Sequence, residues 1–182
     1  MDNIEGNFTD IKALMAEDDP INQELVKFIF EDLNWAIEIV SNGKQALEML
    51  KKNQYDLILM DLRMPVMDGL EATKEIRNHF EEPKKSIPVI GVTAHHFNEE
   101  VQECLNAGMS DYITKPFNVS DFVSKSGDLV LAYRKKLEEM REDQKMESQT
   151  KEESAKLINY DNLYNIAGNN IKTVETIIQL FM

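Results

Sequence analysis

Cysteine and histidine are scarce in this chain, and long hydrophobic runs are absent. The single cysteine, Cys104, excludes an internal disulfide framework and suits a reducing compartment; its helical setting favours a packed thiol over a nucleophile. No stretch approaches the ~20 apolar residues that a membrane span needs, and the N-terminus lacks a signal-peptide pattern. Three histidines without paired ligand spacing argue against a zinc site. We therefore expect a cytoplasmic chain, or the cytoplasmic part of a membrane-anchored parent.

Positive charge is also in short supply. The 182 residues include 20 Lys and Arg against 33 Asp and Glu, which gives a formal net charge of -13. The negative electrostatic field of this charge repels polyanions, so nonspecific binding to nucleic acid or to anionic membranes is not expected. An acidic surface does suit divalent cations. With 42% hydrophobic residues, the chain can build one full domain and part of another.

Five short apolar runs alternate with helical patterns over the first part of the chain. Each helical pattern follows one run, and the repeated strand–helix order implies right-handed crossovers and a parallel sheet. The prediction is a doubly wound α/β fold with a five-stranded parallel sheet in the order 2-1-3-4-5. The expected strands are residues 11–16, 35–40, 57–61, 87–93 and 110–114, and Pro88 stands near the start of the fourth, where an edge residue would be placed. The expected helices begin near Pro20, Gly43, Leu70, Asn98 and Val119.

The composition changes after this domain. Residues 1–10 form a polar tail, and residues 11–133 contain the strand–helix repeats. Residues 134–156 are almost entirely polar and charged, which predicts a linker or a helical extension. Apolar residues return at helical spacing in 157–182, which favours the start of a second, truncated helical domain over a simple extension helix.

Polar side chains stand at the ends of four predicted strands. Glu17 and Asp18 follow the first, Asp61 ends the third, Thr93 ends the fourth, and Lys115 follows the fifth. The predicted strand order places the two acids beside Asp61 at the topological switch point, where ligands bind in such sheets. Three adjacent carboxylates would raise one another's pKa, and a hard divalent cation such as Mg²⁺ relieves this repulsion.

These groups are the parts of a phosphoryl-transfer site. Asp61 ends the central buried strand and is the predicted nucleophile, with a metal, a hydroxyl and a cation around the transferred group. Asp61 taken alone is equally well explained as a cap of the following loop, so the prediction depends on its neighbours.

The whole pattern resembles the receiver domain of two-component response regulators, which has a flavodoxin-like (βα)5 fold. The resemblance rests on the acidic pair, on Leu-Met-Asp-Leu-Arg-Met-Pro-Val-Met-Asp-Gly around Asp61, on Thr93-Ala94, and on Lys115-Pro116-Phe117. It covers about residues 11–133. Each motif is common by itself, but all of them in this order are highly specific.

The resemblance implies a role for each matching residue. Asp61 would accept a phosphoryl group from phosphohistidine, and Thr93 and Lys115 would contact its oxygens. Thr93 and Tyr112 would form the conformational switch. The Mg²⁺ ligands would be Asp18, Asp61, the Arg63 backbone carbonyl and, mostly through water, Glu17. We further expect Arg63 and His95 to tune hydrolysis of the acyl phosphate, although both also suit exposed loop positions.

The first acidic loop also resembles receivers of hybrid histidine kinases. The tail from residue 157 is similar to the opening of a histidine-phosphotransfer domain, but no histidine follows His96. The implied partner is a histidine kinase or a histidine-phosphotransfer domain. The chain has no kinase catalytic domain, and its own activity would be self-phosphorylation and dephosphorylation. A homodimer through the charged segment stays open, although that segment lacks apolar heptads.

Three other classes were weighed. A haloacid-dehalogenase-like phosphatase would want a second Asp where Arg63 stands, and this chain has no room for its cap. A flavodoxin-like cofactor binder needs a phosphate-cradling loop after the first strand, whereas this loop is Glu-Asp-Asp-Pro. A receiver-like binding module that is never phosphorylated is the remaining alternative.

Overall fold

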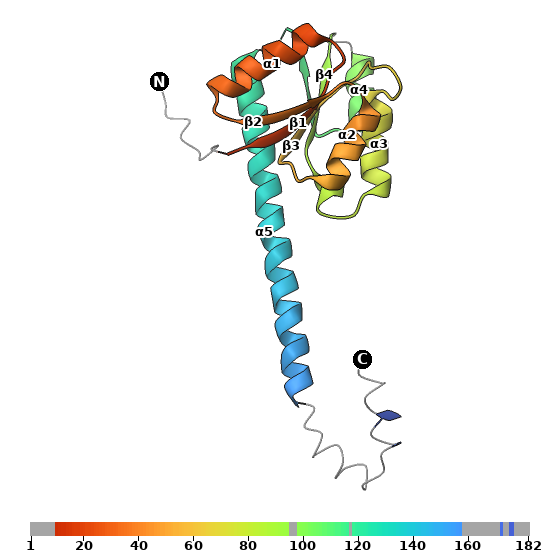
Figure 1. Cartoon of the computed structure of the whole chain (residues 1–182), viewed down its shortest axis with the longest axis vertical. Helices are drawn as coiled ribbons and strands as arrows, with labels where there is room; N and C mark the ends of the chain where they lie inside the picture. The colour runs from red at the N-terminus through yellow and green to blue at the C-terminus, as the bar shows by residue number, and fades with distance from the viewer. Residues whose placement is uncertain (1–9, 95–97, 117, 158–171, 173–174, 177–182) are drawn as a thin grey trace. The chain divides into compact units, whose positions relative to one another are not determined.

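The computed structural model describes residues 10–94, 98–116, 118–157, 172 and 175–176. Strands and helices alternate along the chain as the sequence predicts (Figure 1). The strands are β1 (Lys12–Ala16), β2 (Ala36–Val40), β3 (Leu57–Asp61), β4 (Val89–Thr93) and β5 (Asp111–Thr114). The helices are α1 (Pro20–Asp32), α2 (Gly43–Lys52), α3 (Gly69–His79), the 3-10 turn η1 (Lys84–Ser86), α4 (Asn98–Ala107) and α5 (Val119–Leu157).

The five strands form one parallel sheet in the order β2-β1-β3-β4-β5, which confirms the predicted doubly wound topology. Every residue of β3 and β4 is buried, as the two nearly continuous apolar runs predict for strands covered on both faces. The register pairs Ala16 with Met60 and Asp61 with Val92. The carboxyl ends of these neighbouring strands therefore meet at one edge of the sheet.

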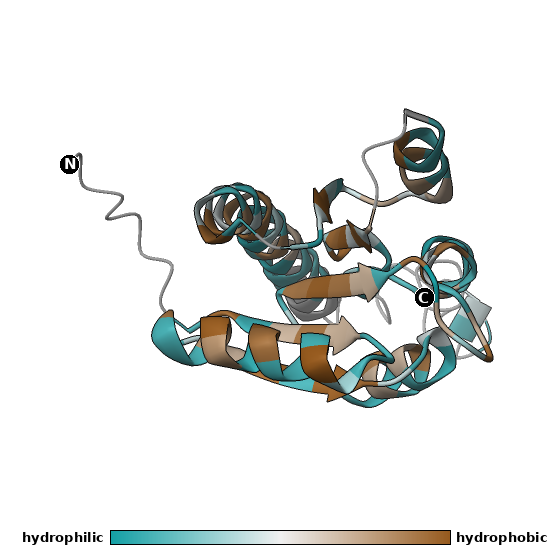
Figure 2. Cartoon of the chain, turned by 90° about the horizontal axis from the view of Figure 1, so that it is seen from above, coloured by the Kyte–Doolittle hydropathy of each residue, from teal (hydrophilic) through white to brown (hydrophobic). Residues whose placement is uncertain are grey.

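Two apolar cores cover the two faces of the sheet, and the apolar strands lie between helices on both sides (Figure 2). On one face, Phe30 of α1, Trp35 and Phe122 of α5 pack with ring centroids 5.6 to 5.9 Å apart. On the other, the residues of α2, α3 and α4 form the larger cluster. Cys104 is fully buried in that cluster, so the prediction of a packed thiol is confirmed.

Polar side chains fix where the helices begin. The Asp19 carboxylate caps α1 by accepting from the Ile21 N–H at 2.7 Å, and Pro20 occupies the first turn as expected. The Asp68 carboxylate caps α3 in the same way, accepting from the Glu71 N–H at 2.8 Å. Because Asp68 also closes the loop that follows Asp61, this cap links the site loop to a helix.

Pro88 lies near the start of the fourth strand, as expected, and β4 itself lies between β3 and β5. Pro88 immediately precedes β4, and its carbonyl accepts from the Ile58 N–H at 2.9 Å. A proline lacks only its own N–H, so it can stand at the entrance of an internal strand. Gly127 lies inside the continuous helix α5.

Two compact units divide the chain, residues 1–137 and residues 138–182. The first contains the sheet and its covering helices. In the second, residues 138–157 are helical as the last part of α5, and the side chains from 141 to 151 are exposed. The region 157–182 lies outside the described residues except for 157, 172, 175 and 176, so its assignment stays a prediction.

Over the described part of the chain, no helix combines the length and apolarity needed to cross a membrane.

Candidate functional site

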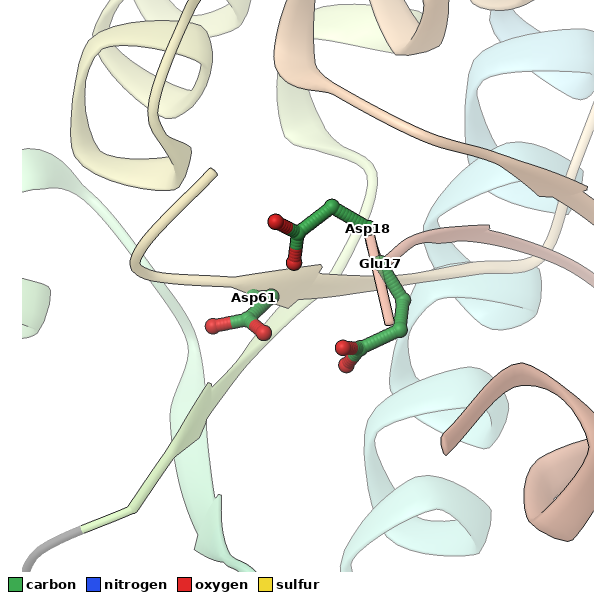
Figure 3. Close-up of side chains that lie close together, drawn as sticks. All are labelled: Glu17, Asp18 and Asp61. Carbon is green, nitrogen blue, oxygen red and sulfur yellow. The ribbon is translucent and has the colours of Figure 1, made fainter. Parts of the chain in front are cut away.

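Three carboxylates gather beyond the ends of β1 and β3, as Figure 3 shows. Glu17, Asp18 and Asp61 each offer an oxygen, and these oxygens all lie within 4.8 Å of one another. Asp61 ends β3 and the other two follow β1, so the parallel pairing of these strands creates the cluster. Glu17 and Asp61 are buried, whereas Asp18 is exposed. The cluster therefore combines two buried carboxylates with one that is open to solvent.

Lys115 joins the two buried carboxylates. Its Nζ lies 2.6 Å from Asp61 Oδ2 and 2.6 Å from Glu17 Oε2. Burial by itself lowers the pKa of Lys115, but the hydrogen bonds to Asp61 and Glu17 outweigh this effect and raise it above its ordinary value. Lys115 is therefore a permanent cation at neutral pH. It lies beside Asp61, with its charge shared between two acids.

Glu17 is held by more partners than the sequence suggests. The Asn22 amide donates to Glu17 Oε1 at 2.9 Å, and the Gln23 amide donates to the Glu17 carbonyl at 2.6 Å. Burial raises the pKa of Glu17, the bonds from Lys115 and Asn22 oppose the rise, and the charge of Asp61 adds to it. Both amides come from the first turn of α1. Helix α1 thus fixes the orientation of the buried acid.

The loop after Asp61 orients the Asp61 carboxylate. The Arg63 backbone N–H donates to Asp61 Oδ1 at 3.1 Å, while Lys115 occupies Oδ2. Gly69 begins α3 directly against this turn, and a Cβ added there would stand 2.2 Å from the Asp61 carbonyl oxygen. Only glycine fits so close an approach. Val66, at φ +73°, shares this loop, and the Met67 N–H bonds the Pro65 carbonyl across it at 2.9 Å.

Thr93 lies at the end of β4, buried to 3% exposure. Its hydroxyl donates to Glu100 Oε2 of α4 at 2.7 Å. The other Glu100 oxygen, Oε1, lies 3.8 Å from Arg63 Nη2. Glu100 therefore stands between two residues that the sequence places around the phosphoryl group.

Tyr112, the predicted aromatic switch, lies on β5 opposite Gly91 and is half-buried. The Nζ of Lys125 lies 4.9 Å from the centre of the Tyr112 ring and donates to the Tyr112 carbonyl at 2.8 Å. His95 and Phe117, which the resemblance also involves, lie outside the described residues.

The donor set fits a hard divalent cation. All three candidate ligands are carboxylate oxygens, and their spacing allows one ion to reach each of them. One of the three is exposed, which leaves a side open for water or a phosphate oxygen. The position of the Arg63 carbonyl as a further ligand stays a prediction.

Known proteins carry the same pattern. Residues 13–126 match the model of the response regulator receiver domain. This chain is similar to the receiver domain of the sensor histidine kinase PA1611 from Pseudomonas aeruginosa PAO1, whose structure holds a magnesium ion in its active-site cleft. The identity is 34%, the TM-score is 0.62, and the match covers 67% of this chain and 98% of that one.

A further similar structure is a co-crystal of the Saccharomyces cerevisiae histidine phosphotransfer signalling protein Ypd1 with the receiver domain of its downstream response regulator Ssk1. The identity is 27%, the TM-score is 0.63, and the match covers 69% of this chain and 92% of that one. A curated relative is the Probable histidine kinase 1 of Oryza sativa subsp. indica, 38% identical over 136 residues, which are 59% of this chain and 14% of that protein. Another is the signal transduction histidine-protein kinase BarA of Escherichia coli (strain K12), 41% identical over 104 residues, 57% of this chain and 11% of the kinase.

The chain belongs to the response regulator receiver domain family of two-component signal transduction. Its relatives also include the Hybrid signal transduction histidine kinase I of Dictyostelium discoideum, and the chain spans 6 to 14% of the length of these curated kinases.

Sequence reasoning missed several residues of the site. Asn22 and Gln23 were seen only as part of a helix start, Gly69 only as a loop residue, and Glu100 only as part of a helix. For Asn22 and Gln23 a signal existed, because they follow the acidic pair within one helical turn. Glu100 gave none, since its partner is chosen by the packing of α4.

Proposed function

We propose that this chain is a phosphoacceptor receiver of a two-component phosphorelay, with Asp61 as the residue that takes the phosphoryl group. The observation that carries the proposal is the convergence of Asp18, Glu17 and Lys115 on Asp61 at one sheet edge, within 4.8 Å for the carboxylates and 2.6 Å for the Lys115 contacts. The family membership reported above gives the reaction class.

The transfer is a displacement at phosphorus. An Asp61 carboxylate oxygen forms the new P–O bond, the P–N bond of a phosphohistidine breaks, and the imidazole nitrogen leaves with the electron pair and takes up a proton. Lys115, already beside Asp61 Oδ2, stabilises the negative charge on the phosphoryl oxygens. The Arg63 N–H holds the other Asp61 oxygen and orients the carboxylate.

Glu17, Asp18 and Asp61, with the Arg63 carbonyl, would hold a Mg²⁺ ion. When bound, the ion neutralises charge on the carboxylates and on the phosphoryl oxygens. The oxygen-only donor set supports this choice, and so does the magnesium ion in the similar PA1611 receiver.

Thr93 and Tyr112 would carry the conformational switch. The Thr93 hydroxyl would turn to a phosphoryl oxygen, and the Tyr112 ring would follow it inward. Shifting a two-state equilibrium almost completely needs roughly 5 kcal/mol of differential binding. Charge-assisted hydrogen bonds of about 1.5–3 kcal/mol each are strong enough to supply it.

The donor would be a histidine-phosphotransfer domain or a histidine kinase. Helix α1 starts directly after the acidic loop, and it exposes Ile21, Leu25 and Phe28 at 79, 44 and 69%. Their spacing of four and three residues puts these side chains on one face of the helix. An apolar surface next to the acceptor suits an amphipathic helix of the donor. The Ssk1 receiver crystallised with a histidine phosphotransfer protein supports this partner class.

We extend the proposal to the longer protein that would contain this chain. A hybrid histidine kinase, cytoplasmic at least in this part, would contain the receiver as residues 11–133, a helical extension over 134–156 and the start of a histidine-phosphotransfer domain from 157. A homodimer stays a further possibility for the charged part of α5.

Incubation with acetyl phosphate and Mg²⁺, followed by intact mass measurement, tests the proposal. We expect the gain of one phosphoryl group, and its loss in Asp61→Asn or with a chelator. Asp56→Asn is a matched control. Asp56 directly precedes β3, at the end opposite Asp61, and its carboxylate lies 2.9 Å from Arg134. A chain that gains no phosphoryl group under these conditions is instead a receiver-like binding module.

A further inference from the structure

Glu100 and a phosphoryl group on Asp61 would compete for the hydrogen of the Thr93 hydroxyl. In this structure the Thr93 hydroxyl donates its only hydrogen to Glu100 Oε2 at 2.7 Å. A threonine hydroxyl has a single O–H, so it cannot donate to Glu100 and to a phosphoryl oxygen at the same time. The Thr93–Glu100 bond therefore belongs to the conformation in which Thr93 does not serve the acceptor.

The surroundings make this bond a strong one. Thr93 is buried, and the Glu100 side chain is only 23% exposed. A hydrogen bond from a hydroxyl to a carboxylate is among the stronger kinds in proteins. Breaking it without replacement would lose a charge-assisted bond made by a buried hydroxyl, which is unfavourable. The conformation that holds it is thus stabilised until a better acceptor arrives.

Arg63 is a second partner for the Glu100 carboxylate. Its guanidinium is 74% exposed, so it can move, and it lies 3.8 Å from the other Glu100 oxygen. Once Thr93 turns to a phosphoryl oxygen, Arg63 can close on Glu100 and neutralise the carboxylate that Thr93 released. The Glu100 charge thus has a partner in both conformations.

We propose that Glu100 is a positioning residue that restrains the receiver by holding the Thr93 hydroxyl away from Asp61, and so sets how readily the chain is phosphorylated. This inference rests on the proposed function. It adds to the site a residue on α4, an element from which the sequence offered no site residue.

The test compares rate constants of phosphorylation by acetyl phosphate with saturating Mg²⁺, followed by intact mass. Glu100→Ala removes the restraint, and losing a net hydrogen bond corresponds to about a fivefold change in an equilibrium constant. We expect Glu100→Ala to be phosphorylated about three to ten times faster than the wild type. Glu103→Ala, which removes the same charge from an exposed position of the same helix, is expected to stay within about 1.5-fold.

A double-mutant cycle separates the hydrogen bond from simple charge repulsion of the anionic donor. In a Thr93→Ala background, Glu100→Ala is expected to change the rate by less than about 1.5-fold, because the bond is already absent. Glu100→Gln keeps an acceptor oxygen without the charge, and is expected to show less than half of the acceleration of Glu100→Ala.

Equal acceleration by Glu100→Ala with and without Thr93, or by Glu100→Gln and Glu100→Ala, would overturn the inference in favour of charge repulsion. An unaccelerated Glu100→Ala that retains the wild-type circular dichroism would overturn it as well. In each of these cases the wild type still gains a phosphoryl group, so the proposed function survives. A wild type that gains none overturns both.

Discussion

Lys115 and Asp61, 54 residues apart in sequence, are joined by a 2.6 Å contact between Nζ and Oδ2. The same ammonium neutralises the fully buried Glu17. Lys115→Ala would leave two neighbouring carboxylates without a counter-charge, and we expect a loss of about 2 kcal/mol of unfolding free energy in metal-free buffer. Mg²⁺ should shrink this loss, because a bound cation replaces the missing charge.

Urea unfolding with EDTA and with excess Mg²⁺ measures both values. Lys44→Ala, at an exposed position of α2, is the control and should change stability by less than about 0.5 kcal/mol in either buffer. An equal loss for Lys115→Ala in the two buffers would count against a metal among these carboxylates.

Gly69 is the point where α3 meets the acceptor strand. In Gly69→Ala, the new Cβ would lie 2.2 Å from the Asp61 carbonyl oxygen and 2.8 Å from Met60 Cγ. The backbone must shift to relieve this overlap, so we expect a loss of about 2–3 kcal/mol in stability and a phosphorylation rate at least about tenfold lower. Thermal unfolding and acetyl phosphate labelling check the two effects. The neighbouring exposed Glu71→Ala should leave both nearly unchanged, and a wild-type labelling rate in Gly69→Ala would contradict the prediction.

The exposed face of α1 predicts an effect on transfer from the protein donor but none on labelling by acetyl phosphate. Phe28→Ala removes the largest exposed ring of this face, which is 69% accessible and so contributes little to folding. We expect phosphotransfer from a histidine-phosphotransfer domain to slow about tenfold, since buried aromatic residues dominate many interfaces. Labelling by acetyl phosphate should not change. Glu48→Ala, at an exposed position of α2 outside this face, is the control. If transfer from the protein donor proceeds at the wild-type rate in Phe28→Ala, the donor does not dock on this face.

Ser126 in α5 is fully buried, and its Oγ has no hydrogen-bond partner among the residues that the structure describes. Burying an unsatisfied hydroxyl is unfavourable, so Ser126→Ala is expected to raise the unfolding free energy by about 1 kcal/mol. Chemical denaturation of the variant measures the change. The exposed Ser124→Ala is the matched control and should lie within about 0.5 kcal/mol of the wild type. A clear loss of stability in Ser126→Ala would reveal a partner for this hydroxyl.

Glu38 on β2 predicts a pH dependence. Lys12 contacts its carboxylate at 2.7 Å and the Tyr55 hydroxyl donates to it at 2.6 Å, and these bonds lower the pKa of Glu38. Burial, together with the bond to Glu38, raises the pKa of Tyr55 to about 12. Tyr55 therefore keeps its hydroxyl hydrogen, and remains a donor to Glu38, at acidic and neutral pH. A lowered carboxyl pKa contributes stability above the ordinary Glu value of about 4.3 and loses it as the pH falls through the folded-state value.

The comparison is wild type against Glu38→Gln. We expect the wild type to be more stable by less than about 1 kcal/mol near pH 7, because the pair is partly exposed. The difference should shrink as the pH falls below the ordinary Glu value of about 4.3 and through the lower folded-state pKa. Denaturant titrations between pH 3 and 7 measure it, and a difference that grows in acid would refute the assignment.

Much of the fold could be predicted because its signals are local. Buried runs such as 57–61 are apolar without alternation, and each is followed by a helical period and a cap, as in Asp19 and Pro20. The predicted strand order is that of flavodoxin-like doubly wound sheets, since the handedness of the crossovers alone does not fix it. Pro88 by itself does not place β4 in the sheet, because a proline's missing N–H is equally compatible with an edge strand and with the entrance to an internal one.

The sequence by itself determined that this chain folds as a doubly wound α/β domain and that Glu17, Asp18, Asp61, Thr93 and Lys115 stand at strand ends. Residue type and period are sufficient for that. Only the tertiary structure decided that Lys115 bridges Glu17 and Asp61, that Gly69 presses on the Asp61 carbonyl, and that Thr93 gives its hydrogen to Glu100. These contacts depend on how helices pack against the sheet and on the side-chain rotamers that result, and no local pattern encodes them.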